Sequence, residues 1–173
     1  MAAPQINPAS PAVSSPAPET GVLGIGPAGP RVRGLYLDAA PTPSVDVALP
    51  GKPFMLRADV TPTRGVHVYA PGNASYTPVA LTIDPQPGVI SGAPKYPRAV
   101  ELFFAPLKER VQVFSSAFRL EREITVTLAG TTLALAANQT LTIKGTLEYQ
   151  ACDDKLCYLP QTLPLTWTVR IKR

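Results

Sequence analysis

From about residue 33 to the C-terminus, the pattern is one of apolar residues at every second position, and no window keeps a helical period. This alternation is typical of strands with one face in a core and the other in solvent. The alternating sets are Val45/Val47/Leu49, Phe54/Leu56/Ala58/Val60, Val66/Val68, Val79/Leu81/Ile83, Val111/Val113, Phe118/Leu120/Ile124/Val126/Leu128, Leu141/Ile143/Leu147/Tyr149 and Leu163/Leu165/Trp167/Val169/Ile171. Turn residues separate them at Pro50-Gly51, Thr63–Gly65, Pro71–Asn73, Pro85–Gly88 and Ala129-Gly130. The pattern predicts an all-β fold, an immunoglobulin-like antiparallel β-sandwich.

One stretch, residues 92–110, does not alternate cleanly. It contains several prolines and the pair Phe103-Phe104. We interpret it as a long loop or irregular edge that carries exposed aromatic side chains. Loops of this length in compact domains are often functional.

The start of the chain differs in composition from the rest. Seven of the 21 prolines fall within residues 1–30, mixed with Ala, Ser and Gly. Such a segment has little apolar surface to bury and favours extended, unpacked backbone. We therefore predict a disordered Pro/Ala/Gly-rich linker over residues 1–32 and a single domain, the sandwich, over residues 33–173.

Several classes of function are disfavoured by composition and motifs. The net charge is only +4, and Lys and Arg form no run, so we expect no nucleic-acid partner. No stretch reaches the roughly 18 apolar residues of a membrane span. The first five residues lack the basic start and apolar run of an export signal, so we expect a signal or anchor to lie outside this sequence. We find no phosphate-binding loop or hydrolase triad, and we expect a monomer without a cofactor.

The two cysteines of the chain, Cys152 and Cys157, lie five positions apart. In the chain-entropy model, a disulfide across so short a loop stabilises a fold by about 2 kcal/mol, against about 4–5 kcal/mol for one that closes about a hundred residues. A structural bridge would do more by joining distant strands. The spacing therefore favours a disulfide that opens and closes, and we predict thiol–disulfide exchange.

The cysteines are expected in a hairpin. Predicted strands over 141–151 and 157–170 would be joined by a four-residue loop, which places Cys152 opposite Cys157. Opposed residues have Cα atoms about 4.5–5.5 Å apart, which a disulfide can span. Cys152 shares a face with polar residues and Cys157 with apolar ones, so an unbroken ladder cannot hold both. We expect a bulge between Cys157 and Leu163, caused by Pro160 or Pro164, with the cysteines at an accessible edge.

The neighbours of the cysteines do not favour strongly acidic thiols. No helix N-terminus is expected there, and Asp153 and Asp154 outnumber Lys155. Such a pair is a weak independent oxidant and a good substrate for a partner that brings its own thiolate. Two alternatives stay open. One is a hairpin-stapling disulfide in an immunoglobulin-like binding module, and the other is a copper or zinc site formed by the cysteines with His67.

The segment Tyr149-Gln-Ala-Cys152-Asp-Asp-Lys-Leu-Cys157-Tyr-Leu-Pro160 resembles the active-site hairpin of the periplasmic N-terminal domain of DsbD, the bacterial thiol:disulfide interchange protein. The stretch Gly65-Val-His67-Val-Tyr69-Ala-Pro-Gly72 is similar to the His/Tyr strand of that family. The resemblance covers about residues 40–172. It implies an immunoglobulin-like sandwich in the periplasm that passes electrons from a membrane-embedded thiol reductase module to thioredoxin-fold proteins.

The resemblance also implies roles for individual residues. Cys157 would form the mixed disulfide with partners and Cys152 would resolve it, which makes the domain a thiol–disulfide oxidoreductase. An aromatic residue of a cap loop shields the disulfide in this family, and Phe103 or Phe104 is the candidate here. The cysteine loop is one residue shorter than in the best-known member, which changes the geometry of the hairpin. The residues expected to line the site are His67, Tyr69, Tyr149 and Tyr158.

Overall fold

The computed structural model describes residues 30–73, 75–127 and 139–172, and all regular structure in these ranges is β-strand. Accordingly, these ranges contain no helix that could cross a membrane. The strands are β1 (Val32–Arg33), β2 (Leu37–Pro43), β3 (Val47–Ala48), β4 (Pro53–Pro62), β5 (His67–Tyr69), β6 (Ala80–Ile83), β7 (Val89–Lys95), β8 (Val100–Phe104), β9 (Glu109–Phe114), β10 (Phe118–Val126), β11 (Gln139–Tyr149), β12 (Ala151–Cys152) and β13 (Gln161–Ile171).

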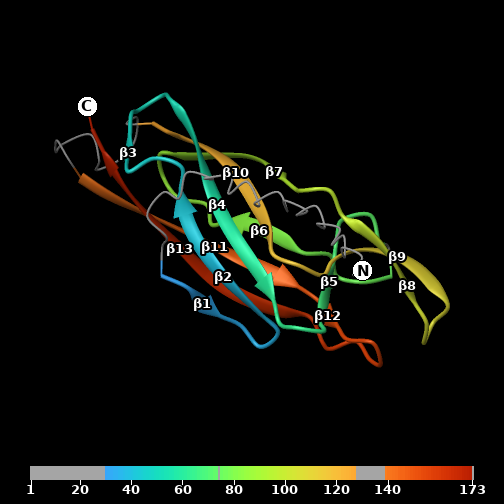
Figure 1. Cartoon of the computed structure of the whole chain (residues 1–173). Coiled ribbons are helices and arrows are strands. Elements are labelled where there is room, and N and C mark those ends of the chain that lie inside the picture. Colours follow the sequence, from blue (N-terminus) through green and yellow to red (C-terminus); the bar gives the residue numbers. More distant parts are fainter. Residues whose placement is uncertain (1–29, 74, 128–138, 173) are drawn as a thin grey trace, which may run out of the picture.

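Two large sheets face each other and a smaller one lies at one end of the molecule (Figure 1). The first large sheet has the strand order β1-β2-β4-β10-β7, and the second has the order β3-β13-β11-β6. The small sheet has the order β12-β5-β9-β8. Among the described strands, neighbours pair antiparallel except β3 and β13, which run parallel. The predicted all-β sandwich is confirmed.

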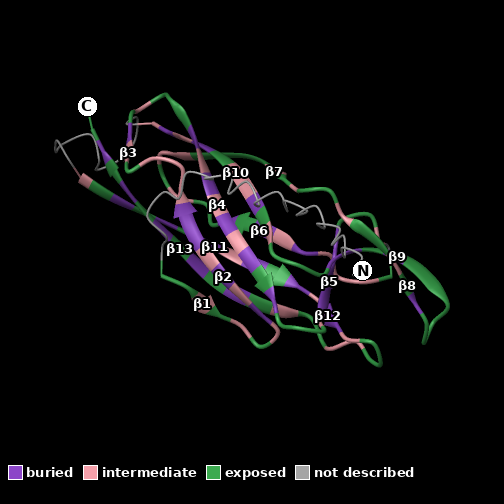
Figure 2. Ribbon diagram, in the orientation of Figure 1, coloured by how far each residue is buried: buried purple, intermediate pink, exposed green. Residues whose placement is uncertain are grey.

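The core lies between the two large sheets and follows from the period-two alternation. Along β4 and β13, buried residues alternate with more exposed ones, which in β4 are mainly of intermediate burial (Figure 2). Trp167 on β13 is only 1% exposed, and its indole N–H donates a hydrogen bond of 2.8 Å to the carbonyl oxygen of Arg57 on β4. This bond joins the two sheets and satisfies the one polar atom of a large buried ring.

The predicted turns are confirmed at the positions that the structure describes. Gly51, Gly65, Gly72 and Gly88 all have positive φ angles, between 75° and 103°. Glycine adopts this backbone region without steric cost, which is why these residues separate the strands. Leu128 and the predicted turn at Ala129-Gly130 lie outside the described residues, as does most of the predicted linker.

The structure corrects part of the prediction for residues 92–110. The stretch is not a long loop, because it contains the end of β7, the whole of β8 and the start of β9. The irregular edge is confirmed: β7 and β8 are edge strands of their sheets, the pairing of β7 with β10 is irregular, and Phe103 is exposed. The period-two signal fails here because β8 and the turn after it expose apolar side chains such as Val100, Phe103 and Leu107. Strand β2 was also missed, because Pro41 and Pro43 argue against a strand. Beyond Ala39, β2 pairs with β4 on one side only, and proline is tolerated at such an edge.

Strand β5 lies between two cores, and this positions the candidate site. His67, Val68 and Tyr69 are all buried, so the strand has no solvent face. Val68 belongs to the core between the two large sheets, which we call the main core. Tyr69 belongs to a second, smaller cluster with Phe104, Val111, Val113 and Cys152. We call this cluster the small core. It arises because the β8–β9 hairpin covers the end of the sandwich.

Candidate functional site

The cysteine hairpin leaves the main sheet before it reaches the cysteines. The pairing of β11 with β13 ends at Tyr149 opposite Gln161. The chain then enters β12, which pairs with β5 so that Cys152 lies opposite His67. The cysteines themselves form an isolated antiparallel bridge. Between these two paired positions, the chain advances three residues from Tyr149 to Cys152 but four residues from Cys157 to Gln161. The segment that follows Cys157 therefore contains one extra residue.

This extra residue confirms the predicted bulge between Cys157 and Leu163. Pro160 lies within the irregular segment, immediately before β13 begins. Pro164 lies inside the regular ladder, opposite Thr146, so it does not cause the bulge. The shift of register allows the apolar face of β13 to point into the main core while the cysteines point elsewhere.

Asp153 shapes the loop between the cysteines. Its Oδ1 atom accepts hydrogen bonds from the backbone N–H groups of Lys155 (2.8 Å) and Leu156 (2.9 Å). Its Oδ2 atom accepts a bond of 2.7 Å from the hydroxyl of Tyr158. The bonds from Leu156, Tyr158 and Lys155 stabilise the charged carboxylate and lower the pKa of Asp153 to about 2. The carboxylate is therefore a fixed part of the turn.

Cys152 and Cys157 form a disulfide with Cα atoms 4.0 Å apart. The two residues differ in burial: Cys152 is 0% exposed, whereas Cys157 is partly exposed. The prediction that both cysteines lie at an accessible edge is therefore wrong for Cys152. Its strand turns into the small sheet, where the side chain joins the small core. Of the two cysteines, only Cys157 is exposed to solvent, and only in part.

Tyr69 contacts both sulfur atoms. Its hydroxyl oxygen lies 3.2 Å from Sγ of Cys152 and 3.3 Å from Sγ of Cys157. The ring is 0% exposed and stacks on that of Tyr76, with centroids 4.0 Å apart. Burial and the neighbouring Tyr76 raise the pKa of Tyr69 well above its ordinary value, so the phenol stays protonated at neutral pH.

His67 is paired with Cys152 in the ladder of β5 and β12. It is 6% exposed, makes edge-on contacts with Tyr69 and Phe104, and its buried Nε2 atom has no hydrogen-bond partner. Burial lowers the pKa of His67, and the charge of Asp153 opposes this effect only in part. The described residues include no group of three or more His, Cys, Asp and Glu side chains placed to hold a metal ion.

The remaining residues that the sequence predicted at the site differ in how far they are buried. Tyr149 is 1% exposed and belongs to the main core. Tyr158 stacks on Tyr36, with ring centroids 4.0 Å apart, and covers the outside of the hairpin. Phe104 is 4% exposed and belongs to the small core that contains Cys152, whereas the neighbouring Phe103 is 56% exposed. Of the two cap candidates, Phe104 therefore packs beside the site and Phe103 faces solvent.

Tyr76 and Glu109 were not singled out from the sequence as site residues. The hydroxyl of Tyr76 donates a hydrogen bond of 2.9 Å to Oε2 of Glu109. Both residues reach the site through the long-range pairing of β5 with β9, a contact for which the chain carries no local pattern. Asn73 supports that pairing, because its side chain bonds the backbone of Ala70 and of Gln112.

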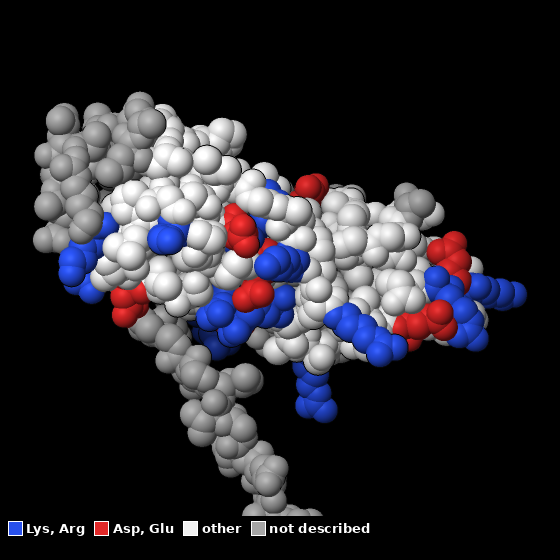
Figure 3. Space-filling model, turned by 90° about the horizontal axis from the view of Figure 1, so that it is seen from above, with Lys and Arg blue, Asp and Glu red and all other residues white. Residues whose placement is uncertain are grey.

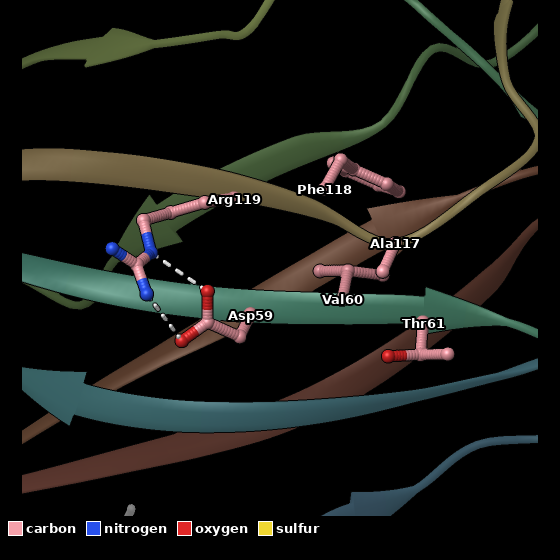
Figure 4. Close-up of a pocket in the computed structure, with 6 residues that line it drawn as sticks. All are labelled: Asp59, Val60, Thr61, Ala117, Phe118 and Arg119. Atoms are coloured by element: carbon pink, nitrogen blue, oxygen red, sulfur yellow. Dashed lines mark hydrogen bonds and ion pairs between the residues drawn. The ribbon is translucent and has the colours of Figure 1, made fainter. Parts of the chain in front are cut away.

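Elsewhere, the described surface offers weaker candidates. A hollow of about 330 Å³ lies over β4 and β10, where Arg119 binds Asp59 through two hydrogen bonds of 2.7 and 3.0 Å (Figure 4). The ion pair neutralises both groups, so the hollow presents no free charge. On the face seen in Figure 3, basic and acidic side chains are interspersed. At the end where β8 and β9 lie, both signs again occur together, and Arg110 pairs there with Glu101.

Fold and site together define a class of protein: a β-sandwich domain with a disulfide hairpin packed against a buried tyrosine at one end, an arrangement consistent with thiol–disulfide interchange. A family model described as "Thiol:disulfide interchange protein DsbD, N-terminal" matches residues 37–166. The chain belongs to this family of DsbD N-terminal domains, and the resemblance noted in the sequence is confirmed.

Among solved structures, the chain is similar to the N-terminal domain of DsbD from Neisseria meningitidis in its reduced form. The two are 16% identical, the match covers 66% of this chain and 80% of that one, and the TM-score is 0.42. No curated protein sequence matches the chain. The assignment to the family is therefore based on the family model.

Proposed function

We propose that this domain relays electrons by reversible opening of the Cys152–Cys157 disulfide. Its reductant would be a membrane-embedded thiol reductase module and its oxidised partners would be thioredoxin-fold proteins of the periplasm, as membership of the DsbD family suggests. The observation that carries the proposal is the unequal burial of two bonded sulfurs beside one hydroxyl group. The partly exposed Cys157 can contact a partner, whereas the buried Cys152 reacts only afterwards, with Cys157.

The exchange would proceed in two displacements. In the reduced domain, the Cys157 thiolate attacks a partner disulfide, forms a mixed disulfide and expels one partner thiolate. Cys152 then loses its proton and attacks Sγ of Cys157, which releases the second partner thiolate and restores the Cys152–Cys157 bond. Two electrons pass to the partner in each cycle. A dithiol of the reductase module returns the domain to its reduced form.

The surroundings of the hairpin support docking of another protein. Leu156 and Leu159, which flank Cys157 along the chain, are 49% and 80% exposed. Phe103 and Leu107, on the β8–β9 hairpin, are 56% and 54% exposed. Exposed apolar side chains on two neighbouring hairpins are typical of an interaction surface. The disulfide also lies outside the ladders of the two large sheets, so its opening would leave the main core in place.

The reduction potential of the disulfide tests this proposal. The folded domain is equilibrated in graded thiol buffers, free thiols are counted with an alkylating tag, and far-ultraviolet circular dichroism monitors the fold. We expect a potential of about −180 to −270 mV, the range of exchange proteins, with the fold intact in both states. A potential below about −300 mV, or unfolding on reduction, would instead make the bridge a structural staple in a binding module.

A further inference from the structure

In the resolving step of the proposed exchange, the thiol proton of Cys152 has to be removed from a buried position. Cys152 must lose its thiol proton before it attacks Cys157, since the thiolate is the nucleophile. The residue is 0% exposed, so water has no direct access to the thiol. A group inside the small core must therefore take up the proton and pass it on.

Two nearby groups are poorly suited to this task. The carboxylate of Asp153 already accepts three hydrogen bonds within the turn, and its pKa of about 2 makes it a weak base. His67 has a free Nε2 atom, but burial penalises its charged form. A proton placed on that imidazole would create a largely buried charge beside the apolar ring of Phe104.

Three other side chains follow one another from the sulfurs to the surface. The Tyr69 hydroxyl oxygen lies 3.2 Å from Sγ of Cys152. The ring of Tyr69 stacks on that of Tyr76, with centroids 4.0 Å apart, and the side-chain interaction between the two tyrosines shifts the pKa of each hydroxyl group. Tyr76 in turn donates to Oε2 of Glu109 at 2.9 Å. The interaction between the tyrosines acts to raise the pKa of Tyr69 and to lower that of Tyr76, which is the pattern expected when Tyr69 donates and Tyr76 accepts.

The far end of this line is open to water. Glu109 is exposed, and with Tyr76 and Arg110 it lines a surface hollow of about 200 Å³. Arg110 is engaged by Glu101 at 2.6 Å. A proton that arrives on Glu109 can therefore pass directly to solvent.

We propose that Tyr69, Tyr76 and Glu109 form a proton relay between the buried Cys152 thiol and solvent. The inference rests on the proposed function, because only an exchanging disulfide needs the relay. Tyr69 touches the reacting sulfur, whereas Tyr76 and Glu109 act through it. Neither tyrosine has to ionise fully, since each hydroxyl gives up one proton as it receives another.

The resolving step then balances as follows. The S–H bond of Cys152 breaks and its proton goes to the Tyr69 oxygen, while the Tyr69 proton moves to Tyr76 and the Tyr76 proton to Glu109. The electron pair left on Sγ of Cys152 forms the bond to Sγ of Cys157. The bond from Cys157 to the partner sulfur breaks, and the partner leaves as a thiolate. The two cysteines are oxidised and the partner disulfide is reduced.

Stopped-flow kinetics separate this step from the first attack. The reduced domain is mixed with excess dithiobis(nitrobenzoate), an aromatic disulfide that releases a coloured thiolate at each displacement. The first phase reports the attack of Cys157 and the second reports resolution by Cys152. Cys152→Ser identifies the second phase, because that variant can release only one thiolate in this way.

Glu109→Gln and Tyr76→Phe test the relay, and Glu101→Gln is the matched control. The control removes an exposed carboxylate from the same β8–β9 hairpin, but one that binds Arg110 rather than a tyrosine. Tyr76→Phe keeps the stacked ring, and thermal unfolding verifies the fold of each variant. We expect both relay variants to slow the second phase at least about tenfold at pH 7, with an upper limit set by the roughly 10²–10⁴-fold that a positioned proton-transfer group contributes, and to leave the first phase unchanged. The difference should shrink as the pH rises and hydroxide removes the proton directly.

Three results would overturn the relay. Second phases of Glu109→Gln and Tyr76→Phe equal to that of the wild type would show that the proton leaves by another route. Equal slowing at every pH, or equal slowing by Glu101→Gln, would indicate a structural effect. A wild-type domain that releases only one thiolate would overturn the relay and the proposed function together. Two wild-type phases with unaffected variants would overturn the relay alone.

Discussion

Cys152 and Cys157 are bonded with Cα atoms 4.0 Å apart, yet one is fully buried and the other partly exposed. This difference predicts which variant traps a partner. In Cys152→Ser the accessible Cys157 can still attack, but no neighbouring thiol resolves the product. A stable mixed disulfide with an oxidised thioredoxin-fold protein should therefore accumulate, visible as a shifted band on a non-reducing gel.

The reciprocal variant provides the comparison. Cys157→Ser retains only the buried thiol, which a folded partner cannot reach, so trapping should be absent or slight. Equal trapping by the two variants would contradict the assignment of roles. Trapping by Cys157→Ser alone would reverse it.

A second prediction concerns the two adjacent phenylalanines of β8. Phe104 is 4% exposed and packs on His67, with ring centroids 6.2 Å apart. Phe104→Ala should lower the free energy of unfolding by about 3 kcal/mol, since it opens a cavity in the small core. It should also make the disulfide easier to reduce by a small thiol such as dithiothreitol. Urea denaturation and reduction kinetics measure the two effects.

Phe103→Ala is the matched control for that experiment. The side chain is 56% exposed, so the change in unfolding free energy should stay within about 0.5 kcal/mol. If Phe103→Ala were the more destabilising of the two, the small core would not have the packing described above.

A third prediction follows from the lowered pKa of Asp153. Because the pKa in the folded state, about 2, lies below the ordinary value of 3.8, the carboxylate stabilises the hairpin fully above pH 3.8. This contribution is lost as the pH falls through about 2, when the carboxyl group is protonated. An NMR titration should show the Lys155 and Leu156 amide signals shifting with that midpoint.

Asp153→Asn separates charge from geometry in this titration. Its amide oxygen can still accept the backbone bonds, but it does not titrate, so the acid transition of these two amides should disappear. A wild-type midpoint near 3.8 would mean that the turn does not hold the carboxylate as described.

A fourth prediction tests the packing of the second large sheet. At Gly145 on β11, an added Cβ atom would overlap the carbonyl oxygen of Thr82 on β6 and lie 3.2 Å from Cζ3 of Trp167. Gly145→Ala should therefore lower the free energy of unfolding by about 1–3 kcal/mol, the usual cost of overpacking. Gly92→Ala on β7 is the control. Its Cβ atom would meet that of Glu123 at 3.4 Å, and we expect a change within about 0.5 kcal/mol.

Much of the sandwich could be predicted because its evidence is local. Alternation along β4, β11 and β13 marks which face is buried, and the glycines with positive φ mark where the strands turn. The prediction failed for β2 and β8. In β2, the prolines indicated that no strand would form, but they are tolerated because the strand has a free edge beyond Ala39. In β8, the alternation is not visible because apolar residues also occupy exposed positions.

The site could be predicted only in part. The spacing of the cysteines indicated an opposed pair and a bulge, and both are present. The burial of Cys152 was not predictable, because it depends on the pairing of β12 with β5 and on the hairpin that covers them. Tyr76 and Glu109 carry no local signal, since they meet across 33 residues of chain.

The sequence by itself determined the all-β architecture, the opposed pair of cysteines and the membership of the DsbD N-terminal family, because strand periodicity, turn residues and cysteine spacing are properties of neighbouring residues. Tertiary structure alone decided which sulfur faces solvent and which tyrosine touches both. Those outcomes depend on pairings between strands far apart in the chain, where burial and hydrogen bonding are settled by the whole fold. The positions of Cys152, Tyr69 and Glu109 relative to one another are therefore a product of packing.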